Sequence, residues 1–175
     1  MRLRFYAPVL VLALVAPFGL TEEKPAKEMP ASKDAKLTSA AKEEKFKLTE
    51  LEQEVLDWTN AQRKAAGLQP FVASEKLTKA ARAHAWNMAS YQTLSHSLGG
   101  DVSSRAMAYG YSWWRIAENI AAGQTSAQDV ISSWMGSSGH RANILGNFTE
   151  IGIGAADAGV GGTRYWAQIF GTPGG

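Results

Sequence analysis

The sequence of 175 residues contains no cysteine, and its charges nearly balance. Without cysteine the chain has no disulfide framework, no thiolate zinc site, no Cys nucleophile and no thiol redox motif. The formal net charge of +2 is too small to indicate nucleic-acid binding by itself. No phosphate-binding Gly-Lys-Thr motif occurs either. The whole chain is 45% hydrophobic and 19% charged, a composition typical of a folded protein.

The chain divides into three segments of different composition. Residues 1–20 place Arg2 and Arg4 before an uncharged apolar run, a pattern that predicts a secretory signal peptide. The run spans only 16 residues, fewer than the roughly 20 of a membrane-spanning helix, although an uncleaved anchor is the alternative. Residues 21–47 carry seven lysines and six acidic residues, which predicts a charged flexible linker. Residues 48–175 hold all six tryptophans and form the expected domain.

Within residues 48–175 the patterns predict helices first and a β-hairpin last. Thr49 and Glu52 fit a capping box that opens one helix, and Ser74 is a candidate cap for the next. Apolar residues alternate over 151–156 and 165–170, with a glycine-rich turn between them. We also expect a short helix over 104–109, a strand over 111–116, and helices from Ser126 and Ser138. This order favours an α+β fold over a doubly wound sheet.

The three histidines occupy different settings. His84 lies on the apolar stripe of the second helix and is expected to be a packed, hydrogen-bonded core histidine. His96 lies in a loop before two glycines, and His140 begins a helical turn, so both rings can face a cleft. Glu118 stands between apolar residues and a glycine, an unusual setting for a merely solvated acid. His96, Glu118 and His140 are therefore the candidates for a binding or catalytic site.

An aromatic stretch lies between the short helix and the next strand. Trp113 and Trp114 follow Tyr109 and Tyr111 closely in the sequence. They form either an exposed patch for glycan or lipid contact or part of the core, and we expect most of them in the core because tryptophan is highly buried on average.

Seven segments together resemble the CAP superfamily in its bacterial branch. This superfamily comprises the cysteine-rich secretory, antigen-five and pathogenesis-related-one proteins. The segments are residues 60–63 (NAQR), 67–70 (GLQP), 81–89 (ARAHAWNMA), 118–120 (ENI), 139–145 (GHRANIL), 151–154 (IGIG) and 165–170 (YWAQIF). Each is weak alone, but they occur in the family's order over nearly all of residues 48–171.

The resemblance implies a three-layer α-β-α sandwich with a small antiparallel sheet and a central cleft. In many members the cleft holds two histidines and two glutamates, and some members bind divalent metals. His96, Glu118 and His140 match three of these four positions. Ser137 stands where eukaryotic members carry the other glutamate, so this chain has a triad, with less negative charge for a metal ion.

Three interpretations of His96, Glu118 and His140 stay open. They form a polar cleft without a metal, a labile divalent-metal site, or a catalytic centre. Two imidazoles and one carboxylate are a recognised zinc ligand set, with water in the fourth position. A catalytic centre would use a metal-bound water with Glu118 as base, or Ser137 or Ser138 activated by a histidine.

These observations together predict a secreted binding module. Its cleft is expected to take a small ligand, with a lipid as the first candidate because some members of the family bind sterols and fatty acids, or a divalent metal such as zinc. The alternatives are an extracytoplasmic metal-assisted hydrolase, either protease or esterase, and a cell-envelope adaptor. We expect a monomer that has no nucleic-acid partner and reaches a membrane only through an uncleaved N-terminal segment.

Overall fold

The computed structural model describes residues 46–175. The elements follow one another as α1 (Glu50–Ala65), β1 (Val72–Ala73), α2 (Glu75–Tyr91), α3 (Val102–Ala108), β2 (Trp113–Ala122), α4 (Ala127–Gly136), α5 (Ser138–Ile144), β3 (Glu150–Asp157) and β4 (Arg164–Pro173). The predicted signal peptide and all of the predicted linker except its last two residues lie outside the described residues.

The strands form one four-stranded sheet in the order β1-β3-β4-β2. The predicted hairpin is β3 and β4, and β2 pairs antiparallel with the other side of β4. The short strand β1 runs parallel to β3, with Val72 opposite Glu150. The sheet is therefore mixed, and the prediction of an antiparallel sheet is corrected at one edge. There the connection from α1 to α2 contributes the two residues of β1, which pair with β3 in parallel.

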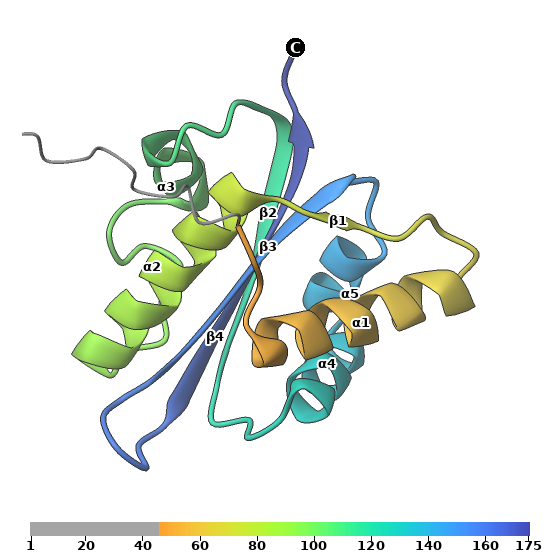
Figure 1. The fold of residues 1–175 in the computed structure, drawn as a ribbon. Coiled ribbons are helices and arrows are strands. Elements are labelled where there is room, and N and C mark those ends of the chain that lie inside the picture. Colours follow the sequence, from red (N-terminus) through yellow and green to blue (C-terminus); the bar gives the residue numbers. More distant parts are fainter. Residues whose placement is uncertain (1–45) are drawn as a thin grey trace, which may run out of the picture. The chain divides into compact units, whose positions relative to one another are not determined.

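Helices cover both faces of this sheet, as Figure 1 shows. Helices α2 and α3 lie on one face, and α1, α4 and α5 lie on the other. Alternate residues of β4 enter different cores, since Trp166 and Phe170 face α1 and α4 whereas Ala167 and Ile169 face α2. The α+β fold and the three-layer sandwich are as the sequence predicted.

The predicted cap of α1 is confirmed. Glu52 N donates to Thr49 Oγ1 (3.3 Å), and Thr49 N donates to Glu52 Oε2 (2.8 Å), so the capping box is complete. Glu52 also binds Arg82 of α2, which ties the start of α1 to the opposite helical layer. Ser126 caps α4 by accepting from Asp129 N (3.1 Å). Ser74 precedes α2 without a side-chain cap hydrogen bond.

Strand β2 begins later and runs longer than predicted. The strand expected over residues 111–116 is Trp113–Ala122, and the short helix is Val102–Ala108. Because both faces of the sheet are covered by helices, residues 116–122 are mostly apolar and show little alternation. The shift places Glu118 inside a central stretch of strand and not in a loop after it.

Two glycines let α2 lie directly on β3. A Cβ atom on Gly152 would overlap the backbone of Leu77, and one on Gly154 would overlap the backbone of Ala81. Neither glycine has a positive φ, so backbone geometry does not require glycine at these positions. The close approach of α2 does require it.

Replacing Gly154 with alanine is expected to destabilise the fold. The added methyl group must displace the α2 backbone, and such overpacking costs about 1–3 kcal/mol. Urea unfolding followed by circular dichroism measures the loss. Gly136→Ala is the matched control because nothing lies within 4 Å of its added Cβ and it ends helix α4. Equal stabilities of the two variants would contradict the close-approach explanation.

Candidate functional site

Glu118 is the centre of a polar cluster beneath the sheet surface. Its side chain is only 3% exposed, and its partners come from helix α2, helix α3 and the segment between them. His96 Nδ1 lies 2.8 Å from Glu118 Oε1, and Arg105 Nη2 donates to Glu118 Oε2. Both carboxylate oxygens therefore have partners from outside the strand.

Arg105 also organises the loop that carries His96, residues 92–101, which we call the His96 loop. Its Nη1 atom donates to the carbonyl oxygens of His96 (2.9 Å), Leu98 (3.4 Å) and Gly100. The side chain is 5% exposed although it belongs to a short helix at the surface. One guanidinium thus connects the His96 loop to Glu118 of strand β2.

His84 lies against the same carboxylate from helix α2. The residue is fully buried as predicted, and its Nε2 lies 3.7 Å from Glu118 Oε1. Among the described residues neither ring nitrogen has a hydrogen bond of standard geometry, although the backbone of Leu98 acts on the ring and partly offsets the lowering of its pKa by burial. The predicted hydrogen bond therefore stays a prediction. Burial lowers the pKa of His84, and the nearby Glu118 only partly opposes this shift.

His140 lies in the first turn of α5 and contacts strand β2 through its backbone. Its backbone carbonyl accepts a hydrogen bond from Asn119 Nδ2 (3.1 Å), and Asn143 of the same helix donates to the Glu118 carbonyl (3.2 Å). Partial burial lowers the pKa of His140, and the proximity of His96 lowers it further. Within residues 46–175 its ring makes no hydrogen bond or ion pair with Glu118.

The surroundings of Glu118 suit a guanidinium better than a divalent metal ion. No group of three or more His, Asp or Glu side chains in the described part of the chain is placed to hold a metal. Arg105 occupies one carboxylate oxygen and carries a permanent positive charge, which opposes a second cation at the same group. The residues as arranged therefore do not fit a bound metal.

Sequence reasoning missed Arg105. A signal was present, since Val102, Arg105 and Ala106 share one face of α3 and place a charge on its apolar side. The two serines considered as nucleophiles receive no support, because Ser137 caps α5 without any side-chain hydrogen bond and Ser138 is exposed.

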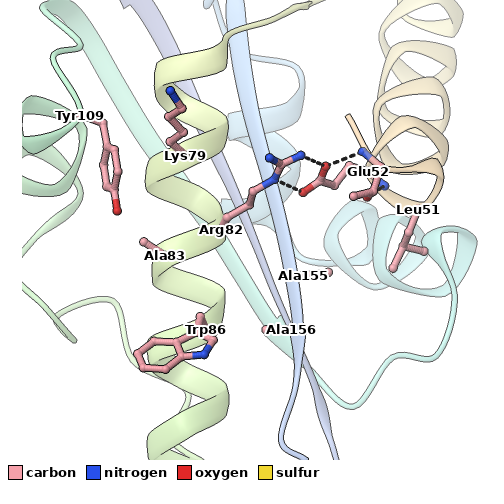
Figure 2. A pocket seen from close by; sticks show the side chains of 10 residues that line it. Leu51, Glu52, Lys79, Arg82, Ala83, Trp86, Tyr109, Ala155 and Ala156 are labelled. Atoms are coloured by element: carbon pink, nitrogen blue, oxygen red, sulfur yellow. Dashed lines mark hydrogen bonds and ion pairs between the residues drawn. The ribbon is translucent and has the colours of Figure 1, made fainter. Parts of the chain in front are cut away.

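A separate shallow groove opens between the start of α1, helix α2 and strand β3, as Figure 2 shows. It has a volume of about 580 Å³. Ala83, Ala155 and Ala156 line it with small side chains, and Trp86 and Tyr109 add aromatic rings that are 63% and 41% exposed. Sequence reasoning did not combine these residues, which come from elements far apart in the chain.

Charged side chains of α2 border the groove. Arg82 forms two hydrogen bonds with Glu52, from Nε to Oε1 (2.7 Å) and from Nη2 to Oε2 (2.5 Å). Among residues 46–175, Lys79 pairs with Glu75 alone (2.7 Å), in an exposed ion pair that contributes little. Lys79 is therefore the side chain through which the groove can meet a negatively charged group.

The aromatic stretch over residues 109–114, which ends in the first residues of β2, is mostly at the surface. Tyr111 is buried, whereas Tyr109, Trp113 and Trp114 are exposed, so the expectation that most of these rings enter the core is wrong.

Among the helices of residues 46–175, none has the length and apolar character that a membrane span requires.

Comparison with known proteins points to one family. The model of the CAP family, described as the cysteine-rich secretory protein family, matches residues 56–170. The protein YkwD of Bacillus subtilis is 35% identical over 156 residues, which is 86% of this chain and 59% of YkwD. The chain thus spans less than two thirds of that relative.

Solved structures share the fold at low sequence identity. An extracellular SCP-domain protein of Bacillus anthracis has a TM-score of 0.65 and 24% identity over 73% of this chain and 45% of its own. An outer surface protein of Borrelia burgdorferi has a TM-score of 0.67 and 20% identity over 74% of this chain and 97% of its own.

The buried neutral state of His84 predicts a pH-dependent stability. Because burial puts its folded-state pKa below the unfolded value of 6.5, the unfolded chain binds the extra proton as the pH falls below that value. Stability is then lost progressively until the folded-state pKa is reached. His84→Gln should flatten the dependence between pH 7 and 5 by up to about 1.4 kcal/mol per pH unit, measured by urea unfolding. His140→Gln is the half-exposed control and should change the slope less; equal slopes in wild type and His84→Gln would refute the assignment.

Proposed function

Because this chain belongs to the CAP family of cysteine-rich secretory proteins, we propose that it is an extracytoplasmic binding module. Its ligand is a lipid-like amphiphile, held in the groove between α1, α2 and β3. The groove takes the place of the cleft at His96, Glu118 and His140 as the ligand space, because Glu118 and Arg105 are buried against each other there.

Two observations support an extracytoplasmic location, one from structural neighbours and one from the N-terminal sequence. The Bacillus anthracis neighbour is an extracellular protein, and the Borrelia burgdorferi neighbour is an outer surface protein. Residues 1–20 also have the order of a signal peptide, with basic residues before a short apolar run.

The observation that carries the proposal is the apolar lining of the groove. Two exposed aromatic rings, Trp86 and Tyr109, stand beside small alanine side chains in a space of about 580 Å³. Ligand sites typically enclose about 300–1,000 Å³ and are lined mainly by apolar and aromatic side chains with few polar groups. An acyl chain would remove these rings from water, which is the favourable term in such binding.

Lys79 specifies the polar end of the ligand. Arg82 is already engaged by Glu52, so Lys79 is the cation that an acidic headgroup would meet. A fatty acid or an anionic lipid therefore suits the groove better than a neutral or cationic amphiphile.

The other predicted functions stay predictions. A divalent metal such as zinc at His96, Glu118 and His140 has little support, given the donor set around Glu118. The hydrolase depends on that metal or on Ser137 or Ser138 and shares this lack of support. The adaptor role depends on segments outside residues 46–175.

Titration of the full chain with the fluorescent fatty acid cis-parinaric acid tests the groove. Trp86→Ala removes one wall and is expected to weaken binding about tenfold or more, since the indole supplies much of the apolar surface that an acyl chain would cover. The free concentration of probe at half saturation gives the affinity directly.

Trp58→Ala provides the matched control. Trp58 is another exposed tryptophan, 39% accessible against 63% for Trp86, and it lies on α1 outside the groove lining. Its replacement should leave the affinity unchanged, and it corrects for any probe bound by residues 1–20. If Trp86→Ala and Trp58→Ala bind the probe equally, the groove is not the lipid site.

A further inference from the structure

We propose that the end of the sandwich where α2, β2 and β3 begin binds a neutral glycan chain. Two neighbouring hollows lie there, of about 470 and 420 Å³, and both are lined by Gly110, Tyr111 and Ser112. The first hollow is also lined by Trp113, and the second extends to Glu150. Neither shares a lining residue with the lipid groove, so this inference stands apart from the proposed function.

The topology of the sheet brings these segments together. Strand β4 ends between the starts of β2 and β3, since Pro173 lies opposite Trp113 and the preceding part of β4 pairs with β3 from Glu150 onward. This is the end of the sheet nearest the C-terminus in Figure 1. The cap and first residues of α2, residues 74–76, complete the lining. Residues far apart in the chain therefore meet at one surface.

Tyr111 lines both hollows with a buried side chain. The residue is 4% exposed, and within residues 46–175 its hydroxyl group makes no hydrogen bond of standard geometry. Burial raises the pKa of Tyr111, and the nearby Glu150 raises it further, so the hydroxyl keeps its proton and remains a donor. Buried polar groups normally have a hydrogen-bond partner. A ligand hydroxyl in the hollows would supply one.

The other polar groups of the lining favour an uncharged ligand. Glu75 pairs with Lys79, which leaves Lys76 and Glu150 as one charge of each sign. The hydroxyl of Ser74 makes no cap hydrogen bond with α2, so it is available to a ligand. Sugar hydroxyl groups both donate and accept hydrogen bonds, and they match a lining that offers hydroxyl, ammonium and carboxylate groups together.

Two exposed indole rings stand at the start of β2. Trp113 is 37% exposed and lines the first hollow, and Trp114 next to it in the chain is 76% exposed. The pairing with β4 shifts between Trp113 and Arg115, which makes Trp114 the extra residue of a bulge. Bulges redirect side chains and are frequent beside functional sites. An indole face that stays in contact with water can pack against the C–H groups of a sugar ring.

A membrane surface is the other partner that exposed aromatic rings suit. Trp113 and Trp114 by themselves would fit either partner, since amphipathic rings also lie at lipid interfaces. The balanced charges and the buried hydroxyl of Tyr111 favour the glycan, because only a ligand that enters the hollows can reach that hydroxyl.

Calorimetric titration of the full chain with chitohexaose, cellohexaose and maltohexaose tests the proposal. All three sugars are neutral and differ in linkage or substituents, and at least one of them should bind saturably. Trp113→Ala should weaken that binding about tenfold or more, because it removes the aromatic surface on which a sugar ring would pack.

Tyr111→Phe removes only the buried hydroxyl group. It should weaken the binding of the same sugar about threefold or more, the effect of one hydrogen bond. The free energy of unfolding in urea should not fall, because no hydrogen bond of standard geometry is lost within residues 46–175. A purely structural role of Tyr111 does not predict this loss of affinity.

Trp58→Ala is the matched control for Trp113→Ala. Trp58 is 39% exposed and lies outside both hollows, so its replacement should leave glycan binding unchanged. No saturable heat with any of the three sugars, or equal binding by Trp113→Ala and wild type, would overturn the proposal. Binding to phosphatidylglycerol vesicles that is lost in Trp113→Ala, in a protein that binds none of the sugars, would also overturn it and identify a membrane contact.

Discussion

A carboxylate buried under a helical layer must be given an opposite charge, and this constraint shapes one end of the molecule. Glu118 is 3% exposed in strand β2, and burial of an ionised acid without a partner is strongly unfavourable. Arg105 meets that need from helix α3. Because the same guanidinium binds three loop carbonyls, the electrostatic pair also determines where the loop with His96 lies.

Residues from both helical layers also approach Glu118. Helix α2 lies directly on β3 because Gly152 and Gly154 present no side chain to it, and this close approach brings His84 within 3.7 Å of the Glu118 carboxylate. On the other face, Asn143 of α5 donates to the backbone of Glu118 and to Asn119 Oδ1. Strand β2 is thus held by polar contacts from both helical layers.

The sequence predicted one cleft, whereas the structure has the cluster at Glu118 and the groove beside α2, two sites with different properties. In the cluster at Glu118 the carboxylate is buried and paired with Arg105, while the His96 side chain on it is 60% exposed, which suits a structural or electrostatic centre. The groove beside α2 is open and lined by aromatic and small apolar side chains, which suits a ligand. A chain without cysteine therefore holds its layers together by packing and by ion pairs such as Arg82 with Glu52, which joins α1 to α2.

Local patterns in the sequence determined the elements, and the family order of its motifs determined the sandwich. The Thr49 capping box and the terminal hairpin were predictable because caps and alternation act over a few residues. The partners of Glu118 were not, since Arg105 lies 13 positions away and His84 comes from another helix. Only the tertiary structure decided that a guanidinium faces this carboxylate. The charge on the apolar side of α3 marks Arg105 as unusual, but its partner depends on how the layers pack. The groove beside Trp86 could not be predicted for the same reason, because its lining residues come from elements far apart in the chain.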